Sequence, residues 1–205
     1  MIQSSRYTIG DPDFDSEHNV LQNKLGITDQ AELERREELA LIAAYDKAAL
    51  KYSDTHSFKT KDIRDLHEIF LGEIFKWAGE YRQVDISSEG IHWCHASHIA
   101  TQMEEYEKRL ARLTPFSPAL TRTELLARLA ELHGELIAIH PFRDGNGRTV
   151  RLLCDLLLMQ AGLSPIRLGA FDDQKIRREY YAAIQEILNN VNYQPLTQLL
   201  DRLVE

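Results

Sequence analysis

Residues 140–151 read His-Pro-Phe-Arg-Asp-Gly-Asn-Gly-Arg-Thr-Val-Arg and lie between two strongly apolar helical patterns. The first pattern ends at Ile139 and the second reaches Gln160, so we predict a loop that joins two buried helices. Gly145 and Gly147 permit positive φ and let the backbone approach a ligand closely. The first N–H groups of the second helix have no partner within that helix. The stretch therefore predicts an anion site.

Charged side chains surround this predicted anion site. Arg148 and Arg151 are three positions apart and share one side of the second helix, where forked guanidinium groups bind phosphate oxygens. Asp144 offers a carboxylate that suits Mg²⁺ shared with phosphates. His140 can accept a proton near neutral pH. A bare Gly-Asn-Gly indicates only a capped turn, but the full set predicts phosphoryl or nucleotidyl transfer.

The stretch resembles, at every specified position, the signature His-x-Phe-x-(Asp/Glu)-Gly-Asn-Gly-Arg-x-x-Arg of the Fic (filamentation induced by cAMP) proteins in the Fic/Doc (Fido) superfamily. The resemblance covers about residues 60–160. It implies a protein adenylyltransferase (AMPylator) that transfers AMP from ATP to a Ser, Thr or Tyr hydroxyl of a target protein and releases pyrophosphate. The alternatives are two other phosphate transfers at the same site, protein phosphorylation or AMP removal, and a catalytically silent nucleotide-binding regulatory module. In the Doc kinases a lysine replaces the second glycine, so Gly147 favours adenylylation.

The resemblance also implies a role for each signature residue. His140 is the base that deprotonates the target hydroxyl, Phe142 is a buried anchor of the loop, and Asp144 holds the Mg²⁺ cofactor. The others bind the nucleotide phosphates: the backbone of Gly145 and Gly147 as an anion nest, Asn146 at the α-phosphate, Arg148 at the β-phosphate and Arg151 at the γ-phosphate.

Residues 82–94 predict a short β-hairpin before the signature. Apolar and polar residues alternate on both sides of a Ser-Glu-Gly turn, with Val84, Ile86, Ile91 and Trp93 as the apolar set. The resemblance implies that this hairpin is a flap that docks a target segment by strand addition. The alternative is a hairpin that only covers the core.

Many Fic proteins carry an inhibitory helix with the pattern (Ser/Thr)-x-x-x-Glu-(Gly/Asn), and we find no intact copy here. Glu32 and Glu105 each follow a threonine by four positions, but Leu33 and Tyr106 come next instead of Gly or Asn. Asp201 stands where a glutamate is needed. The resemblance then implies a toxin whose small antitoxin supplies the glutamate, and it leaves open a degenerate internal inhibitor or no inhibitor.

The remainder of the chain is mostly helical in pattern, which predicts an all-α fold with one hairpin. Residues 1–28 predict an irregular N-terminal arm and residues 29–205 a single helical domain. Asp29, Ser97 and Thr121 are expected N-caps, and Gly162 an expected C-cap residue. The predicted helices cover residues 29–50, 60–75, 97–113, 121–139, 148–160, 172–190 and 195–203.

The composition of the 205 residues excludes several classes of protein. A net charge of −8 argues against a nucleic-acid binder. No apolar run approaches the roughly 20 residues of a membrane span, and the first residues lack a secretory pattern. Two cysteines, Cys94 and Cys154, cannot form a disulfide framework. These observations predict a soluble, cytoplasmic protein.

Histidines outside the signature are expected to be structural. The cluster of His92, Cys94, His95 and His98 resembles a metal site, but the spacing does not favour tetrahedral convergence, so we predict surface histidines. His133 lies two turns before His140, and we expect a packed or solvent-facing side chain instead of a second base.

Overall fold

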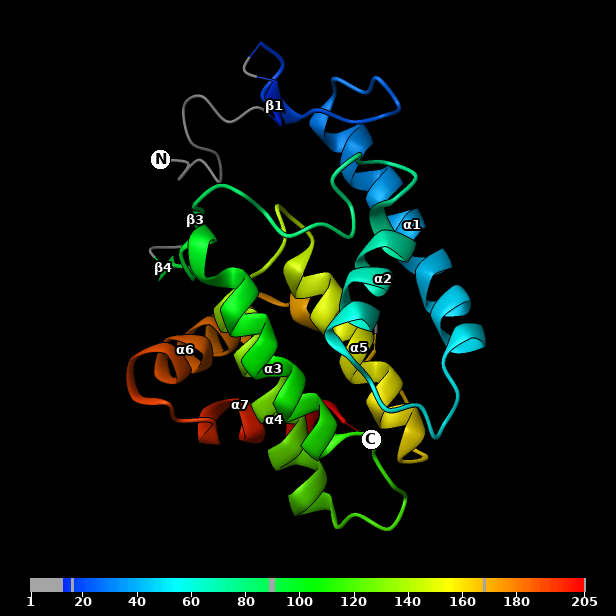
Figure 1. Ribbon diagram of the computed structural model, residues 1–205, viewed down its shortest axis with the longest axis vertical. Helices are drawn as coiled ribbons and strands as arrows, with labels where there is room; N and C mark the ends of the chain where they lie inside the picture. The colour runs from blue at the N-terminus through cyan, green and yellow to red at the C-terminus, as the bar shows by residue number, and fades with distance from the viewer. Residues whose placement is uncertain (1–12, 16, 89–90, 168, 205) are drawn as a thin grey trace.

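The structure is a computed structural model that describes residues 13–15, 17–88, 91–167 and 169–204. It is a helical bundle, as the sequence predicts (Figure 1). Helix α5 (Asn146–Gln160) packs against α1 (Gln30–Lys51), α2 (Thr60–Leu71) and α4 (Arg122–Ile139). It thereby connects the two sides of the bundle.

Most side chains of helix α5 are buried, because the helix is packed between its neighbours. Eleven of its fifteen residues are buried, and the four others are Gly147, Arg148, Arg151 and Met159. Each fully buried leucine or valine side chain contributes about 1.5–3 kcal/mol to the free energy of folding. Three of these four residues belong to the signature, so the partly exposed positions of the helix lie mainly at the predicted site.

Three further helices complete the bundle: α3 (Ile99–Leu113), α6 (Gln174–Asn190) and α7 (Gln194–Leu203). Helix α3 packs against α2 and α4, whereas α6 and α7 pack against each other and against α4. Within the described ranges, no helix combines the length and apolarity that crossing a membrane demands.

Helix starts follow the predicted capping chemistry in two cases, whereas two other helices begin two residues later than predicted. Asp29 caps α1 by accepting the Glu32 N–H at 2.7 Å, and Thr121 forms a capping box that opens α4. The Ser97 prediction is wrong, because the ring of His95 caps a 3-10 helix (Ala96–His98, η1) that leads into α3. A second 3-10 helix (Ala170–Asp172, η2) likewise delays α6 to residue 174.

Helix α2 ends at Leu71, four residues before the predicted end at Phe75. The backbone that follows α2 is bonded by the N-terminal arm: the Lys24 N–H donates to the Ile74 C=O at 2.7 Å. The Phe75 ring then stacks on Trp77 with centroids 4.4 Å apart. Tertiary contacts therefore override a local pattern that continues to look helical.

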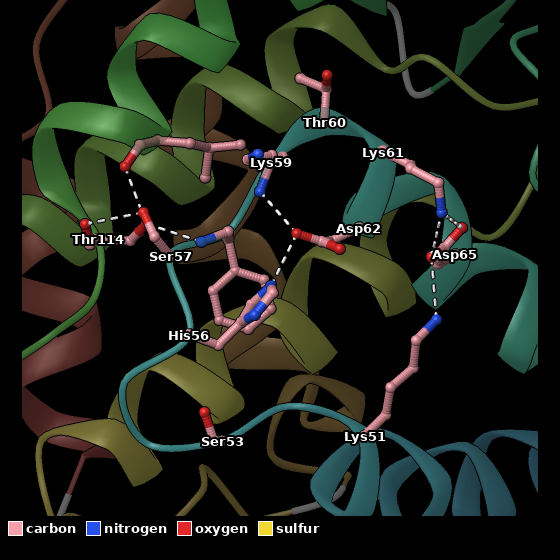
Figure 2. Close-up of polar contacts among 12 residues, drawn as sticks. Lys51, Ser53, His56, Ser57, Lys59, Thr60, Lys61, Asp62, Asp65 and Thr114 are labelled. Carbon is pink, nitrogen blue, oxygen red and sulfur yellow. Dashed lines mark hydrogen bonds and ion pairs between the residues drawn. The ribbon is translucent and has the colours of Figure 1, made fainter.

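The start of α2 is held by a network of side chains from the preceding loop (Figure 2). Asp62 accepts hydrogen bonds from the Lys59 N–H at 2.8 Å and from the His56 ring at 2.9 Å. Asp65 pairs with Lys51 of α1 and with Lys61. The network fixes α2 relative to α1, and α2 in turn supports the signature loop.

Two short hairpins complete the described structure. Strands β1 (Phe14–Asp15) and β2 (Val20–Leu21) pair in the predicted irregular arm, so that arm has some regular structure; its residues 1–12 and 16 lie outside the described ranges. Strands β3 (Ser87–Ser88) and β4 (Ile91–His92) form the predicted hairpin, which is shorter than expected.

Candidate active site

A cavity of about 680 Å³ opens at the N-terminus of α5. Its walls come from α1, the β3–β4 hairpin, α5 and α6 together with the segment that precedes α6. All the predicted signature residues except Phe142 line this cavity: His140, Asp144, Gly145, Asn146, Gly147, Arg148 and Arg151. The fold thus brings together the residues that the sequence marked.

The loop between α4 and α5 begins and ends with left-handed backbone. His140 ends α4 with φ 50°, and Gly145 precedes α5 with φ 76°. A Cβ atom on Gly145 would lie 2.7 Å from the Leu71 Cδ1 atom. Glycine is therefore required at position 145 both for backbone conformation and for the close approach to α2.

The ring of His140 is held from two directions. Its Nδ1 lies 3.2 Å from the Ile137 C=O, and a neutral ring bonded there donates through Nδ1. The indole of Trp93 stacks on the imidazole with centroids 4.0 Å apart and 12° between the planes. This tautomer places the basic lone pair of His140 on Nε2, which suits a proton acceptor.

The apolar residues of the hairpin face the protein. Ile91 and Trp93 are buried, whereas Val84 and Ile86 are half-buried; Ile86 and Trp93 also line the cavity. Their side chains therefore do not form an exposed surface for a target. The extended backbone of the hairpin is what could receive a target strand.

The predicted anchor Phe142 is 1% exposed and stacks on the ring of His67. Asn146 has contacts that the sequence did not indicate. Its amide oxygen accepts from the Phe142 N–H and its amide nitrogen donates to the Phe142 C=O, each at 2.8 Å. Its polar atoms thus brace the loop, and its contact with the α-phosphate stays a prediction.

Arg148 meets a partner that sequence reasoning missed. The Arg148 Nη1 atom lies 2.5 Å from the Glu37 Oε2 atom, and its guanidinium lies over the Phe70 ring. Glu37 is buried, and burial raises the pKa of its carboxyl more than the Arg148 charge lowers it. No pattern flagged Glu37, because Leu33 stands four positions before it where Ser or Thr was sought.

Arg151 lies one turn further along α5, with its guanidinium 5.1 Å from the centre of the Phe171 ring. A Cβ atom on Gly147 would lie 3.3 Å from the Arg151 Nη1 atom. A side chain at position 147 would therefore crowd this arginine. Glycine leaves Arg151 room to reach into the cavity.

Asp144 is the cavity-lining residue whose carboxylate could hold a metal ion. Its Oδ1 atom accepts the Gly145 N–H at 2.6 Å, and its Oδ2 atom lies 3.7 Å from the Arg148 Nη2 atom. A single carboxylate beside a helix N-terminus fits Mg²⁺, which takes one or two carboxylates plus phosphate oxygens and water.

Arg82 is a second residue that the sequence did not indicate. It is 3% exposed, its Nε donates to the His140 C=O at 2.8 Å, and its other nitrogens donate to the carbonyls of Val84 and Cys94. Burial lowers the pKa of its guanidinium. Arg82 ties the hairpin to the start of the signature loop.

A buried acid also lines the cavity. Asp155 accepts hydrogen bonds from the Tyr45 hydroxyl at 2.7 Å and from the Ile166 N–H at 2.8 Å. Burial raises the pKa of the Asp155 carboxyl to about 6. This acid joins α1, α5 and the segment before η2.

The histidines of the predicted surface cluster and His133 lie apart from this chemistry. His92, His95 and His98 are exposed, and His95 pairs with Asp85 at 2.8 Å. His133 is 1% exposed and its Nε2 lies 2.9 Å from the Tyr180 hydroxyl. His133 is therefore packed in the core, which is one of the two positions expected for it.

Comparisons with known proteins identify relatives of this chain. Residues 57–158 match the model of the Fic/DOC family. The protein adenylyltransferase VbhT of Bartonella schoenbuchensis is 35% identical over 153 residues, which are 74% of this chain and 31% of VbhT. The protein adenylyltransferase Fic of Nematostella vectensis is 30% identical over 200 residues, 91% of this chain and 42% of that protein. The chain therefore spans less than half the length of these two relatives.

A solved structure shows the same fold. The BepC protein of Bartonella tribocorum, a VirB-translocated effector crystallised with bound AMPPNP, matches with a TM-score of 0.78 at 20% identity. The match covers 94% of this chain and 96% of that one.

Proposed function

Since this chain belongs to the Fic/DOC family, we propose that its cavity is the active site of a protein adenylyltransferase. The substrates are ATP and a Ser, Thr or Tyr hydroxyl of a target protein, and the products are the AMP-modified protein and pyrophosphate. One observation carries the proposal: a base, a carboxylate, a helix N-terminus and two arginines line a single cavity. Relatives named protein adenylyltransferase support the same class of reaction.

The geometry of His140 supports its role as the base. Its Nδ1 is committed to the Ile137 carbonyl, so Nε2 accepts the hydroxyl proton while the hydroxyl oxygen attacks the α-phosphorus. The bond from the α-phosphorus to the oxygen that bridges to the β-phosphate breaks, and pyrophosphate leaves with that electron pair. Arg148 and Arg151 compensate the charge on the leaving group.

Asp144 is the residue that would hold Mg²⁺, and the ion would supply positive charge to the phosphates of ATP. The protein's own contribution beside it is the N-terminus of α5, whose first N–H groups bind phosphate oxygens. Gly145 and Gly147 allow this approach because neither carries a side chain.

Labelled ATP tests which phosphate is transferred. The protein is incubated in a cell extract with ATP labelled at the α or the γ position, beside a His140→Ala control. We expect α-label and a mass gain of one AMP on a target protein, because Gly147 stands where the Doc kinases have lysine. Transfer of γ-label alone would establish a kinase instead, and ATP binding without either transfer would establish a silent module.

The β3–β4 hairpin is the proposed docking element for the target. Within the described residues each of its strands pairs with one other strand, so each keeps a second backbone edge. Strand addition to such an edge uses main-chain hydrogen bonds. It would place the target hydroxyl beside His140, on which Trp93 of the hairpin segment is stacked.

Control of the activity is proposed to be partly internal. Glu37 occupies Arg148 from within the chain, which favours a competing internal glutamate over one supplied only by a separate antitoxin. A toxin role predicts that overproduction of Glu37→Gln slows cell growth more than overproduction of the parent protein. Equal growth of both strains would leave the glutamate of an antitoxin as the better explanation.

A further inference from the structure

A buried histidine, His67, lies behind the loop that carries Asp144, on helix α2. It is 0% exposed and does not line the cavity. Its ring stacks on Phe142 with centroids 3.9 Å apart and 10° between the planes. It therefore contacts the signature from the core side, where it cannot touch a nucleotide.

Both ring nitrogens of His67 have backbone partners, and these partners determine its tautomer. The Gly79 N–H donates to Nδ1 at 2.8 Å, so Nδ1 carries the lone pair. The proton of the neutral ring is then on Nε2, which donates to the Asp144 C=O at 2.9 Å. A doubly protonated ring has no lone pair to accept the Gly79 N–H, so this pair of bonds requires the neutral ring.

The bond from His67 to the Asp144 carbonyl fixes the orientation of the whole Asp144–Gly145 peptide. The Asp144 C=O and the Gly145 N–H belong to one planar peptide and point in opposite directions. A carbonyl held toward α2 therefore directs the N–H away from α2. That N–H donates to the Asp144 carboxylate at 2.6 Å.

Close packing also restricts rotation of the Asp144–Gly145 peptide. A Cβ atom on Gly145 would lie 2.7 Å from Leu71 and 3.4 Å from the His67 Nε2 atom. Phe70, on the same helix, lies under the guanidinium of Arg148. Helix α2 thus supports both the loop and the first arginine.

We propose that His67 is a positioning residue: by holding the Asp144–Gly145 peptide through its Nε2–H, it orients the Asp144 carboxylate toward the cavity. The effect on nucleotide binding rests on the proposed function, which assigns Asp144 to Mg²⁺ and ATP. Partners of a metal ligand in this position typically change metal affinity about 10–100-fold when they are removed.

Two substitutions separate the two hydrogen bonds of His67. In His67→Gln the amide nitrogen extends to about the position of Nε2 and can still donate to Asp144. In His67→Asn the shorter side chain can accept from Gly79 but does not reach the Asp144 carbonyl. His133→Asn is a matched control for burial, because His133 is 1% exposed and bonds Tyr180 instead of the loop.

The first measurement uses the protein without nucleotide. Amide exchange of Gly145, followed by NMR, should be about 3–10-fold faster in His67→Asn than in the parent, because the hydrogen bond from the His67 ring that holds the Asp144 C=O of the same peptide is lost. His67→Gln should restore slow exchange, and His133→Asn should not alter it. Unchanged Gly145 exchange in His67→Asn would overturn the proposal.

Nitrogen chemical shifts of the parent protein give a test that needs no substitution. They should show the Nε2–H tautomer for His67, whereas an Nδ1–H tautomer would overturn the proposal.

The last measurement is the affinity for a non-hydrolysable ATP analogue with Mg²⁺ and with EDTA. In His67→Asn we expect binding with Mg²⁺ to weaken about 10-fold or more, with little change in EDTA, and recovery in His67→Gln. If Gly145 exchange changes without this Mg²⁺-dependent loss of affinity, the proposal that His67 orients the Asp144 carboxylate is overturned. Failure of the parent to bind the analogue would refute the proposed function, while the exchange data would still decide the role of His67.

Discussion

Replacing Glu37 by Gln should make ATP bind more tightly. Glu37 and Arg148 form an ion pair with 2.5 Å between the charged atoms, and their side chains are 8% and 24% exposed. In the proposed mechanism ATP needs the same arginine for its phosphates, so binding must first break this pair. Glutamine keeps the size of the side chain and removes its charge.

The expected gain follows from the strength of such a contact. A hydrogen bond to a charged group contributes about 1.5–3 kcal/mol, which corresponds to roughly 10–150-fold in an equilibrium constant. Because burial raises the pKa of Glu37 in spite of Arg148, part of this energy already offsets the cost of a buried charge. We therefore expect an increase of about 10–50-fold in ATP affinity, toward the lower part of that range.

Calorimetric titration with a non-hydrolysable ATP analogue and Mg²⁺ measures the change. Glu38→Gln is the matched control, since Glu38 lines the same cavity and belongs to the same helix, but its side chain has no hydrogen bond or ion pair within the described part of the chain. Equal gains from Glu37→Gln and Glu38→Gln would show a general charge effect. No gain from Glu37→Gln would refute the competition between Glu37 and phosphate.

Four further substitutions test the site and its surroundings. His140→Ala should lower AMP transfer about 10²–10⁴-fold with nearly unchanged ATP affinity, whereas Arg151→Ala should weaken both; calorimetry beside a labelling assay compares them, and equal loss of ATP binding would remove the base assignment. Asp144→Asn should weaken ATP binding in Mg²⁺, with partial recovery at high Mg²⁺ concentration; a defect of the same size in EDTA would argue against a metal ligand. Asp155→Asn tests the buried acid: its folded pKa of about 6 lies above the unfolded value of about 4, so ionisation costs the folded state about 3 kcal/mol at pH 7. That cost disappears as the pH falls from 6 to 4, and urea unfolding should show the variant gaining stability relative to the parent as pH rises over this interval, whereas a pH-independent difference would contradict the reasoning.

The sequence by itself determined the helical class, most helix boundaries and the signature loop. These features depend on neighbours in the chain: apolar residues at helical spacing, caps such as Asp29 and Thr121, and glycines where the backbone is left-handed. Local patterns of this kind are visible without knowing what packs against them.

Only the tertiary structure decided which distant residues complete the site. Glu37, His67 and Arg82 are far from the signature in sequence and carry no motif, yet they bind Arg148, the Asp144 carbonyl and the His140 carbonyl. Each is a buried polar group, and such a group must find its partner wherever the packed helices place one. The early end of α2 has a similar origin, because the Ile74 carbonyl, three residues after its end, is bonded by the N-terminal arm. A helix pattern cannot report a partner that lies about fifty residues away in the chain.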